Sequence, residues 1–306
     1  MAPSYIFNTY IWLIDTVRSG KLTLEDIDAR WRQSDLNDTG EAEFPRRKFH
    51  RYRNDILTLF HLNIVCARDA GNYYYIQGEG DIRARQARQW IENAYSLQVA
   101  LNEAKGIENR LVYEQQPKGT EYLSTIVRAM KRNCKVELLY KPFNKDEYTT
   151  AFAPYCLKMF RQRWYIVGEA DNHQGEIRIY ALDRVGKVSP ILNSKFSLPR
   201  HFDAQQYFEP FYGAFTAGEA TRVVIRANKH AVPFLDSLPL HSSQVKLEET
   251  DDAATYEFFI APTFDFEQEL RTFGAEIQVI EPQSLAQRLA AEARSVLELY
   301  SSIPNN

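Results

Sequence analysis

The sequence predicts a multidomain α+β protein with three folded parts and two connecting segments. Its 306 residues exceed the usual size of one domain, and 44% of them are apolar, which is enough for several cores. The hydrophobic pattern changes twice, from helical spacing to strand alternation at Cys134 and to mixed strands and helices after residue 218. The predicted parts are, in chain order, 1–80, 81–133, 134–192, 193–218 and 219–306.

Composition narrows the class of protein. No apolar run approaches the roughly 18 residues of a membrane span, and the N-terminus lacks the basic start and cleavage site of a signal peptide. Cys66, Cys134 and Cys156 are odd in number and far apart, which argues against a disulfide framework or a zinc site and predicts a cytoplasmic protein. The net charge of −3 does not indicate nucleic-acid binding, but an average can hide a local patch.

Residues 1–80 contain the signals of three helices and a β-hairpin. Apolar residues recur at helical spacing from Ile6 to Val17, and Thr23 with Asp26 forms the start signal of a second helix. Pro45 is tolerated at the start of a third helix. Two β-rich runs, 64–67 and 73–77, flank a turn signal. This is the element order of a winged helix-turn-helix.

The third helix is predicted to have an apolar face and a basic face. Phe49, Tyr52, Ile56 and Phe60 recur at spacings of three and four, with cationic residues largely off that face. Guanidinium and amide groups at a helix start can contact phosphates and base edges in the major groove. The candidate DNA-binding residues, with Arg47 and Arg51 foremost, are Arg46, Arg47, Lys48, His50, Arg51, Arg53 and Asn54.

Two features of this segment leave an alternative open. Basic runs are usually solvated faces of small cores, and residues 1–80 hold eleven acidic residues against ten basic ones. DNA binding therefore requires the acidic side chains to lie away from the basic face. The following segment is predicted to be a helical linker, with helices at 81–105 and around 123–130, and it either transmits a rigid-body change or acts as an inert spacer.

Strand alternation predicts a small β-barrel in residues 134–192. The run 135–140 alternates charged and apolar side chains, and further strand-like runs cover 148–154, 163–168 and 176–182. The third run, Arg163-Trp164-Tyr165-Ile166-Val167-Gly168, resembles the signature of the WYL domain with Ile in place of Leu. Tyr140, Pro154, Leu157 and the run from Arg178 to Val185 resemble the family pattern around it.

The resemblance implies a Sm-like or SH3-like barrel that senses a nucleotide or a nucleic acid. A guanidinium group can donate paired hydrogen bonds to phosphate oxygens, and a tyrosine ring can stack on a base. Alternation places Arg163 and Tyr165 on one face and Trp164, expected in a core, on the other. An internal ion pair of Asp183 with Arg184 remains a competing interpretation. The candidate effector-binding residues are Tyr140, Lys158, Arg163, Tyr165, Arg178 and Arg184.

The last part, residues 219–306, has strands and helices in the order β-α-β-β-α-β, followed by a final helix from Pro282. This order resembles a ferredoxin-like sandwich. It is similar to the WCX extension of bacterial WYL-type transcriptional regulators, which implies a role in dimerisation. The resemblance implies a homodimer that represses transcription from a pseudo-palindromic double-stranded DNA operator.

No catalytic motif stands out, so we do not expect an enzyme. The sequence lacks a phosphate-binding P-loop, a Gly-x-Ser-x-Gly elbow and a His-Glu-x-x-His motif, and its six histidines have no metal-binding spacing. No cofactor is expected. Two alternatives remain: a sensing or scaffold module whose N-terminal domain binds protein, and a nucleic-acid-processing enzyme whose site assembles only in the fold.

Overall fold

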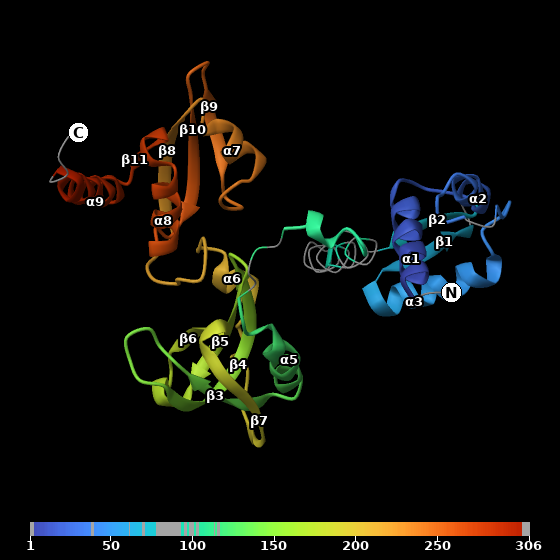
Figure 1. Ribbon diagram of the computed structural model, residues 1–306, viewed down its shortest axis with the longest axis horizontal. Helices are drawn as coiled ribbons and strands as arrows, with labels where there is room; N and C mark the ends of the chain where they lie inside the picture. The colour runs from blue at the N-terminus through green and yellow to red at the C-terminus, as the bar shows by residue number, and fades with distance from the viewer. Residues whose placement is uncertain are drawn as a thin grey trace. The chain divides into compact units, whose positions relative to one another are not determined.

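A computed structural model describes residues 3–37, 40–60, 62–68, 71–77, 93–94, 97, 101, 104–112, 114 and 117–301 (Figure 1). The chain divides into two compact units, Met1–Glu114 and Gln115–Asn306. Among the described residues, helices combine with antiparallel sheets of two, five and four strands, which confirms the predicted α+β class. No described helix has the length and apolar character needed to cross a membrane.

The N-terminal unit has three helices followed by a two-stranded hairpin, as predicted. The element bounds are α1 Pro3–Arg18, α2 Leu24–Arg32, α3 Arg46–Phe60, β1 Asn63–Ala67 and β2 Tyr73–Gln77. Side chains from all five elements meet in one buried core, in which Trp31 contacts the Phe44 ring edge-on at 4.9 Å. The predicted helix over 81–105 falls almost entirely outside the described residues.

Two polar devices fix the helices of this unit. Thr23 and Asp26 form a capping box at the start of α2, because each side chain accepts a hydrogen bond from the backbone N–H of the other residue. The buried carboxylate of Asp28 accepts the backbone N–H of Phe44 at 2.8 Å and also bonds the guanidinium of Arg46. Asp28 therefore ties α2 to the chain immediately before α3.

The first subdomain of the C-terminal unit is a five-stranded antiparallel sheet with one covering helix. The bounds are α5 Leu123–Lys131, β3 Cys134–Tyr140, β4 Tyr148–Phe160, β5 Arg163–Ala170, β6 Ile177–Ala181 and β7 Val185–Lys195. The strand order is β6-β5-β4-β3-β7, and α5 packs against the sheet (Figure 1). Within the described residues no pairing joins β6 to β7, so a closed barrel stays a prediction.

Two strands of this sheet differ from the sequence expectation. The β4 strand continues past Pro154, because a bulge between Pro154 and Cys156 lets its second half pair with β5. The β7 strand was not predicted, because most of its residues are at least partly exposed and its polar and apolar residues do not alternate. The extension of β4 matters for function because it places Lys158 directly opposite Tyr165, another candidate effector residue, in the strand register.

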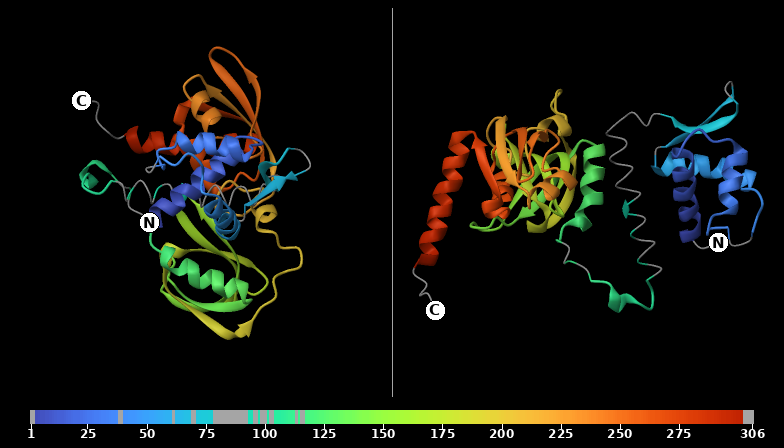
Figure 2. Two further views of the ribbon diagram at one scale, coloured as in Figure 1. Left: turned by 90° about the vertical axis from the view of Figure 1, so that its right-hand side faces the viewer. Right: turned by 90° about the horizontal axis from the view of Figure 1, so that it is seen from above.

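The second subdomain of the C-terminal unit contains the predicted β-α-β-β-α-β order and the final helix. The bounds are β8 Thr221–Asn228, α7 Val232–Ser237, β9 Val245–Glu249, β10 Ala253–Ile260, α8 Phe264–Thr272, β11 Ile277–Glu281 and α9 Gln283–Ser301. The strands pair antiparallel in the order β11-β8-β10-β9. Figure 2 shows α9 projecting from this part of the unit. Assignment to the ferredoxin-like fold stays a prediction.

The connection between the two subdomains of the C-terminal unit is closely packed. It contains a short helix that was not predicted, α6 Ala204–Phe208, whose first amides are capped by Asp203. The Phe160 ring at the end of β4 contacts the Tyr212 ring edge-on at 5.3 Å. A Cβ atom on Gly213 would lie 2.0 Å from the carboxylate of Asp265, so this backbone passage requires glycine.

Candidate functional site

Helix α3 separates its side chains into a buried face and an exposed stripe. The four residues predicted for the apolar face are all buried. The exposed stripe, at helical spacings of three and four, contains Arg47, His50, Arg51, Asn54 and Thr58. Asp55, the single carboxylate of α3, accepts a hydrogen bond from the Tyr10 hydroxyl at 2.6 Å and lies outside the stripe. The stripe therefore presents cations and hydrogen-bonding groups without an acid.

The remaining candidates on α3 have partners inside the N-terminal unit. Arg46 bonds Asp28, as described above. Arg53 donates from Nε to the carbonyl of Ile64 at 2.8 Å, and its guanidinium lies over the rings of Phe49 and Tyr74. Lys48 is half-buried. These contacts support the fold of α3 and the hairpin, so the predicted set divides into an exposed stripe and structural cations.

A column of aromatic rings and one guanidinium lies at the end of β3. Tyr140 stacks on Tyr180 with ring centroids 4.3 Å apart, and Tyr180 also accepts a hydrogen bond from the Tyr148 hydroxyl at 3.1 Å. The guanidinium carbon of Arg184 lies 5.4 Å from the Tyr140 centroid and 4.2 Å from that of Phe143. Burial raises the pKa of the Tyr140 hydroxyl, although the charge of Arg184 opposes this shift.

Arg163 and Tyr165 join this column from strand β5. Asp183 lies 3.7 Å from Nε of Arg163, so the carboxylate pairs with this arginine and not with neighbouring Arg184. Tyr165 lies close to the same charges: burial raises the pKa of its hydroxyl, and Arg163 and Arg184 oppose the shift. The effector cluster is defined here as Tyr140, Arg163, Tyr165, Asp183 and Arg184.

The other two predicted effector residues make their main side-chain contacts outside this cluster. Arg178 bonds Glu176 and lies 3.0 Å from Nδ1 of His173, and it approaches the column only at Tyr180. Lys158 lies over the Phe208 ring, 4.7 Å from its centroid, at the connection between the two subdomains. Burial lowers the pKa of this ammonium group. Lys158 therefore borders the effector cluster through its register partner Tyr165, while its ammonium group lies over Phe208.

Sequence reasoning missed Phe143, whose ring covers Arg184. The available signal was an aromatic residue within the polar turn 141–147 that directly follows Tyr140. The cluster also contains buried polar atoms that have no hydrogen-bond partner among the described residues, namely Asp183 Oδ1 and Arg184 Nε. Buried polar atoms are normally paired, so these two atoms are candidates for contact with a ligand.

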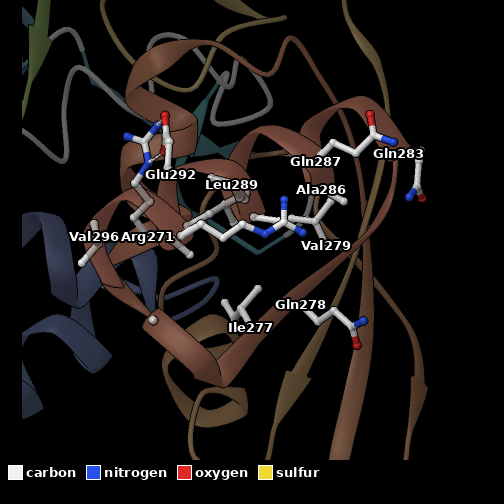
Figure 3. A pocket seen from close by; sticks show the side chains of 15 residues that line it. Arg271, Ile277, Gln278, Val279, Gln283, Ala286, Gln287, Leu289, Glu292 and Val296 are labelled. Atoms are coloured by element: carbon white, nitrogen blue, oxygen red, sulfur yellow. Dashed lines mark hydrogen bonds and ion pairs between the residues drawn. The ribbon is translucent and has the colours of Figure 1, made fainter. Parts of the chain in front are cut away.

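A groove of about 760 Å³ lies between α8, β11 and α9. Figure 3 shows apolar side chains such as Leu289, Ile277 and Val279 inside it, with Gln278 and Gln287 at its sides. Val296 lines the groove, and beyond it the C-terminal end of α9 exposes further large apolar side chains: Leu297, Leu299 and Tyr300. Such a surface on a folded domain indicates an interaction site.

The described residues hold no group of three or more His, Cys, Asp and Glu side chains placed to bind a metal ion. All three cysteines are free thiols. The candidate sites therefore offer guanidinium groups, amides, hydroxyls and aromatic rings. This chemistry suits recognition of phosphates and flat rings.

Comparison with known proteins identifies two domains in the chain. A family model of the WYL domain matches residues 121–190, and a model of the WCX domain matches residues 219–297. No curated protein sequence matches the chain.

Two solved structures are among those that match the chain. Proteasome accessory factor B/C (PafBC) of Arthrobacter aurescens is 17% identical, with 99% of this chain and 48% of that chain covered at a TM-score of 0.38. A CRISPR Cas-related protein is 9% identical, with 98% and 92% covered at a TM-score of 0.40. The chain thus spans about half the length of PafBC.

The WYL match contains the run Arg163–Gly168 and all five residues of the effector cluster. The WCX match contains the four-stranded sheet and the groove beside α9. The chain therefore contains a WYL domain followed by a WCX domain.

Proposed function

We propose that the protein is a homodimeric transcriptional regulator that binds double-stranded DNA through the exposed stripe of α3. The observation that carries this proposal is the absence of any acidic side chain from the stripe, although residues 1–80 are slightly acidic as a whole. Arg47 and Arg51 carry fixed positive charge, and Asn54 can pair with an adenine edge. In this proposal α3 is the recognition helix of a winged helix-turn-helix and the β1–β2 hairpin is its wing.

The effector cluster supports a second function, the sensing of a nucleotide or a nucleic acid. Arg163 and Arg184 supply phosphate-binding donors, and Tyr165 supplies a ring face and a hydroxyl group. Tyr140 is buried, stacks on Tyr180 and supports the guanidinium of Arg184. An effector changes DNA binding only if it binds one arrangement of the two recognition helices more tightly than another. In this proposal the protein acts as a repressor in the cytoplasm, where its free thiols remain reduced.

The groove beside α9 supports the proposed dimer. The same helix borders the groove from Gln283 to Val296 and exposes apolar side chains near its end, so a two-fold axis would let each copy fill the groove of the other. Leu297→Asp should shift the protein from dimer to monomer in sedimentation equilibrium, whereas Glu248→Lys, at an exposed position of the opposite edge strand β9, should leave the dimer intact. Equal dissociation of both variants would contradict this interface.

The direct test of DNA binding is capture of genomic fragments by the purified full-length protein, followed by gel shifts on the recovered sequence. We expect two half-sites with a fixed spacing near one or two helical turns, because a dimer presents two recognition helices. A protein that recovers no enriched duplex, but retains other proteins through the same exposed stripe, would instead be a scaffold or sensing module.

A further inference from the structure

Phe143 holds an unusual position for a large apolar side chain. Its ring is 77% exposed, and it belongs to none of the three apolar cores formed by the described residues. Its close neighbour is the guanidinium of Arg184, 4.2 Å from the ring centroid. Burial of apolar surface therefore explains little of this placement, and the contact with one cation explains more of it.

The turn that carries Phe143 is fixed at its base and exposed beyond it. The backbone N–H of Lys141 donates to the carbonyl of Arg184 at 3.0 Å, which sets the turn directly over that residue. The five residues 143–147 are all exposed. The ring can therefore leave Arg184 without opening a core or breaking a strand pairing.

Two polar atoms under the Phe143 ring lack a hydrogen-bond partner among the described residues. The atoms are Arg184 Nε and Asp183 Oδ1, and both are buried. A phenyl ring covers the flat guanidinium but has no donor or acceptor for these atoms. A nucleobase would cover the same face of the guanidinium, and the phosphate joined to it could accept hydrogen bonds at the edges of Arg184 and Arg163, where the N–H groups lie.

We propose that Phe143 is a placeholder that occupies the position of a ligand's aromatic base over Arg184 and must be displaced when the effector binds. The inference rests on the proposed effector function and narrows it to ligands in which a flat ring is joined to a phosphate. Phosphate compounds without a ring would bind the guanidinium edges and leave Phe143 in place. The residue then sets the affinity for base-bearing ligands alone.

The test compares two variants of the full-length protein with two probes. The probes are a single-stranded oligodeoxynucleotide and an abasic oligomer with the same number of phosphates, and binding is measured by calorimetry. Phe143→Ala should tighten binding of the base-bearing strand by about two- to fivefold, because an exposed cation–π contact no longer competes. Phe143→Trp should weaken it, since tryptophan binds a guanidinium more strongly. Affinity for the abasic oligomer should stay constant.

Each contrary outcome has a separate meaning. Weaker binding of the base-bearing strand by Phe143→Ala would show that the ring stacks on the ligand, and would overturn the inference. Equal changes for both probes would also overturn it, because a structural role does not distinguish them. If neither probe nor a mononucleotide binds the wild type, the proposed effector function fails as well. A mononucleotide that follows the same pattern as the strand would support the inference, because it would show that one base joined to a phosphate is sufficient to displace Phe143.

Discussion

Removal of the buried carboxylate of Asp28 should destabilise the N-terminal unit and, with it, the exposed stripe of α3. In Asp28→Ala the buried N–H of Phe44 loses its acceptor, which costs about 1–3 kcal/mol. The partly exposed guanidinium of Arg46 also loses its partner but can be rehydrated, so we add only about 1 kcal/mol for it. The expected total is about 2–4 kcal/mol, a large part of the stability of a domain.

Two control variants separate the terms of this estimate. Asp28→Asn keeps an acceptor for the Phe44 N–H and should lose about half as much. Glu43→Ala removes a carboxylate that is 72% exposed and 3.9 Å from the same guanidinium, so it should change stability by no more than about 0.5 kcal/mol.

Hydrogen exchange of the α2 and α3 amides in the full-length protein measures the local free energy of opening. We expect Asp28→Ala to accelerate exchange in both helices. Equal exchange in Asp28→Ala and Glu43→Ala would refute the assigned role of the buried carboxylate.

Two further predictions concern the C-terminal unit. Gly213→Ala places a Cβ atom 2.0 Å from the Asp265 carboxylate and should lower stability by about 1–3 kcal/mol in thermal unfolding, whereas Gly186→Ala, which meets a flexible Glu147 side chain at 3.3 Å, should have little effect. Burial lowers the pKa of His241 below its usual 6.5, so the unfolded chain takes up a proton first as pH falls. The stabilisation is full above about pH 6.5 and is lost below it, and His241→Gln should give a flatter dependence between about pH 7 and pH 5.

Local sequence signals predicted much of the architecture. The spacing of Phe49, Tyr52, Ile56 and Phe60 predicted the buried face of α3, because helical periodicity is a local property. The Thr23 capping box was readable for the same reason. Alternation along β5 also predicted that Arg163 and Tyr165 would lie together, and both border Asp183.

Long-range contacts decided what the sequence left open. Nothing near Arg53 in the chain indicates that the Ile64 carbonyl would accept from its Nε, and Arg46 differs from Arg47 only through a carboxylate 18 residues away. The bulge in β4, which extends the strand, has no clear sequence signal, so the contact of Lys158 with Phe208 could not be predicted from the sequence. Partner identity, and not residue type, separates the structural cations from the exposed ones.

The most direct test of the central proposal compares two double variants that each remove two positive charges. In Arg47→Ala/Arg51→Ala the charges come from the exposed stripe of α3, and in Arg226→Ala/Lys229→Ala they come from exposed positions around the end of β8. Affinity for the recovered duplex is measured at several salt concentrations around 150 mM. The first variant should remain folded, lose about 10- to 100-fold in affinity and show a salt slope reduced by about two, while the second binds like the wild type. Equal affinities for the two variants would contradict DNA reading by α3.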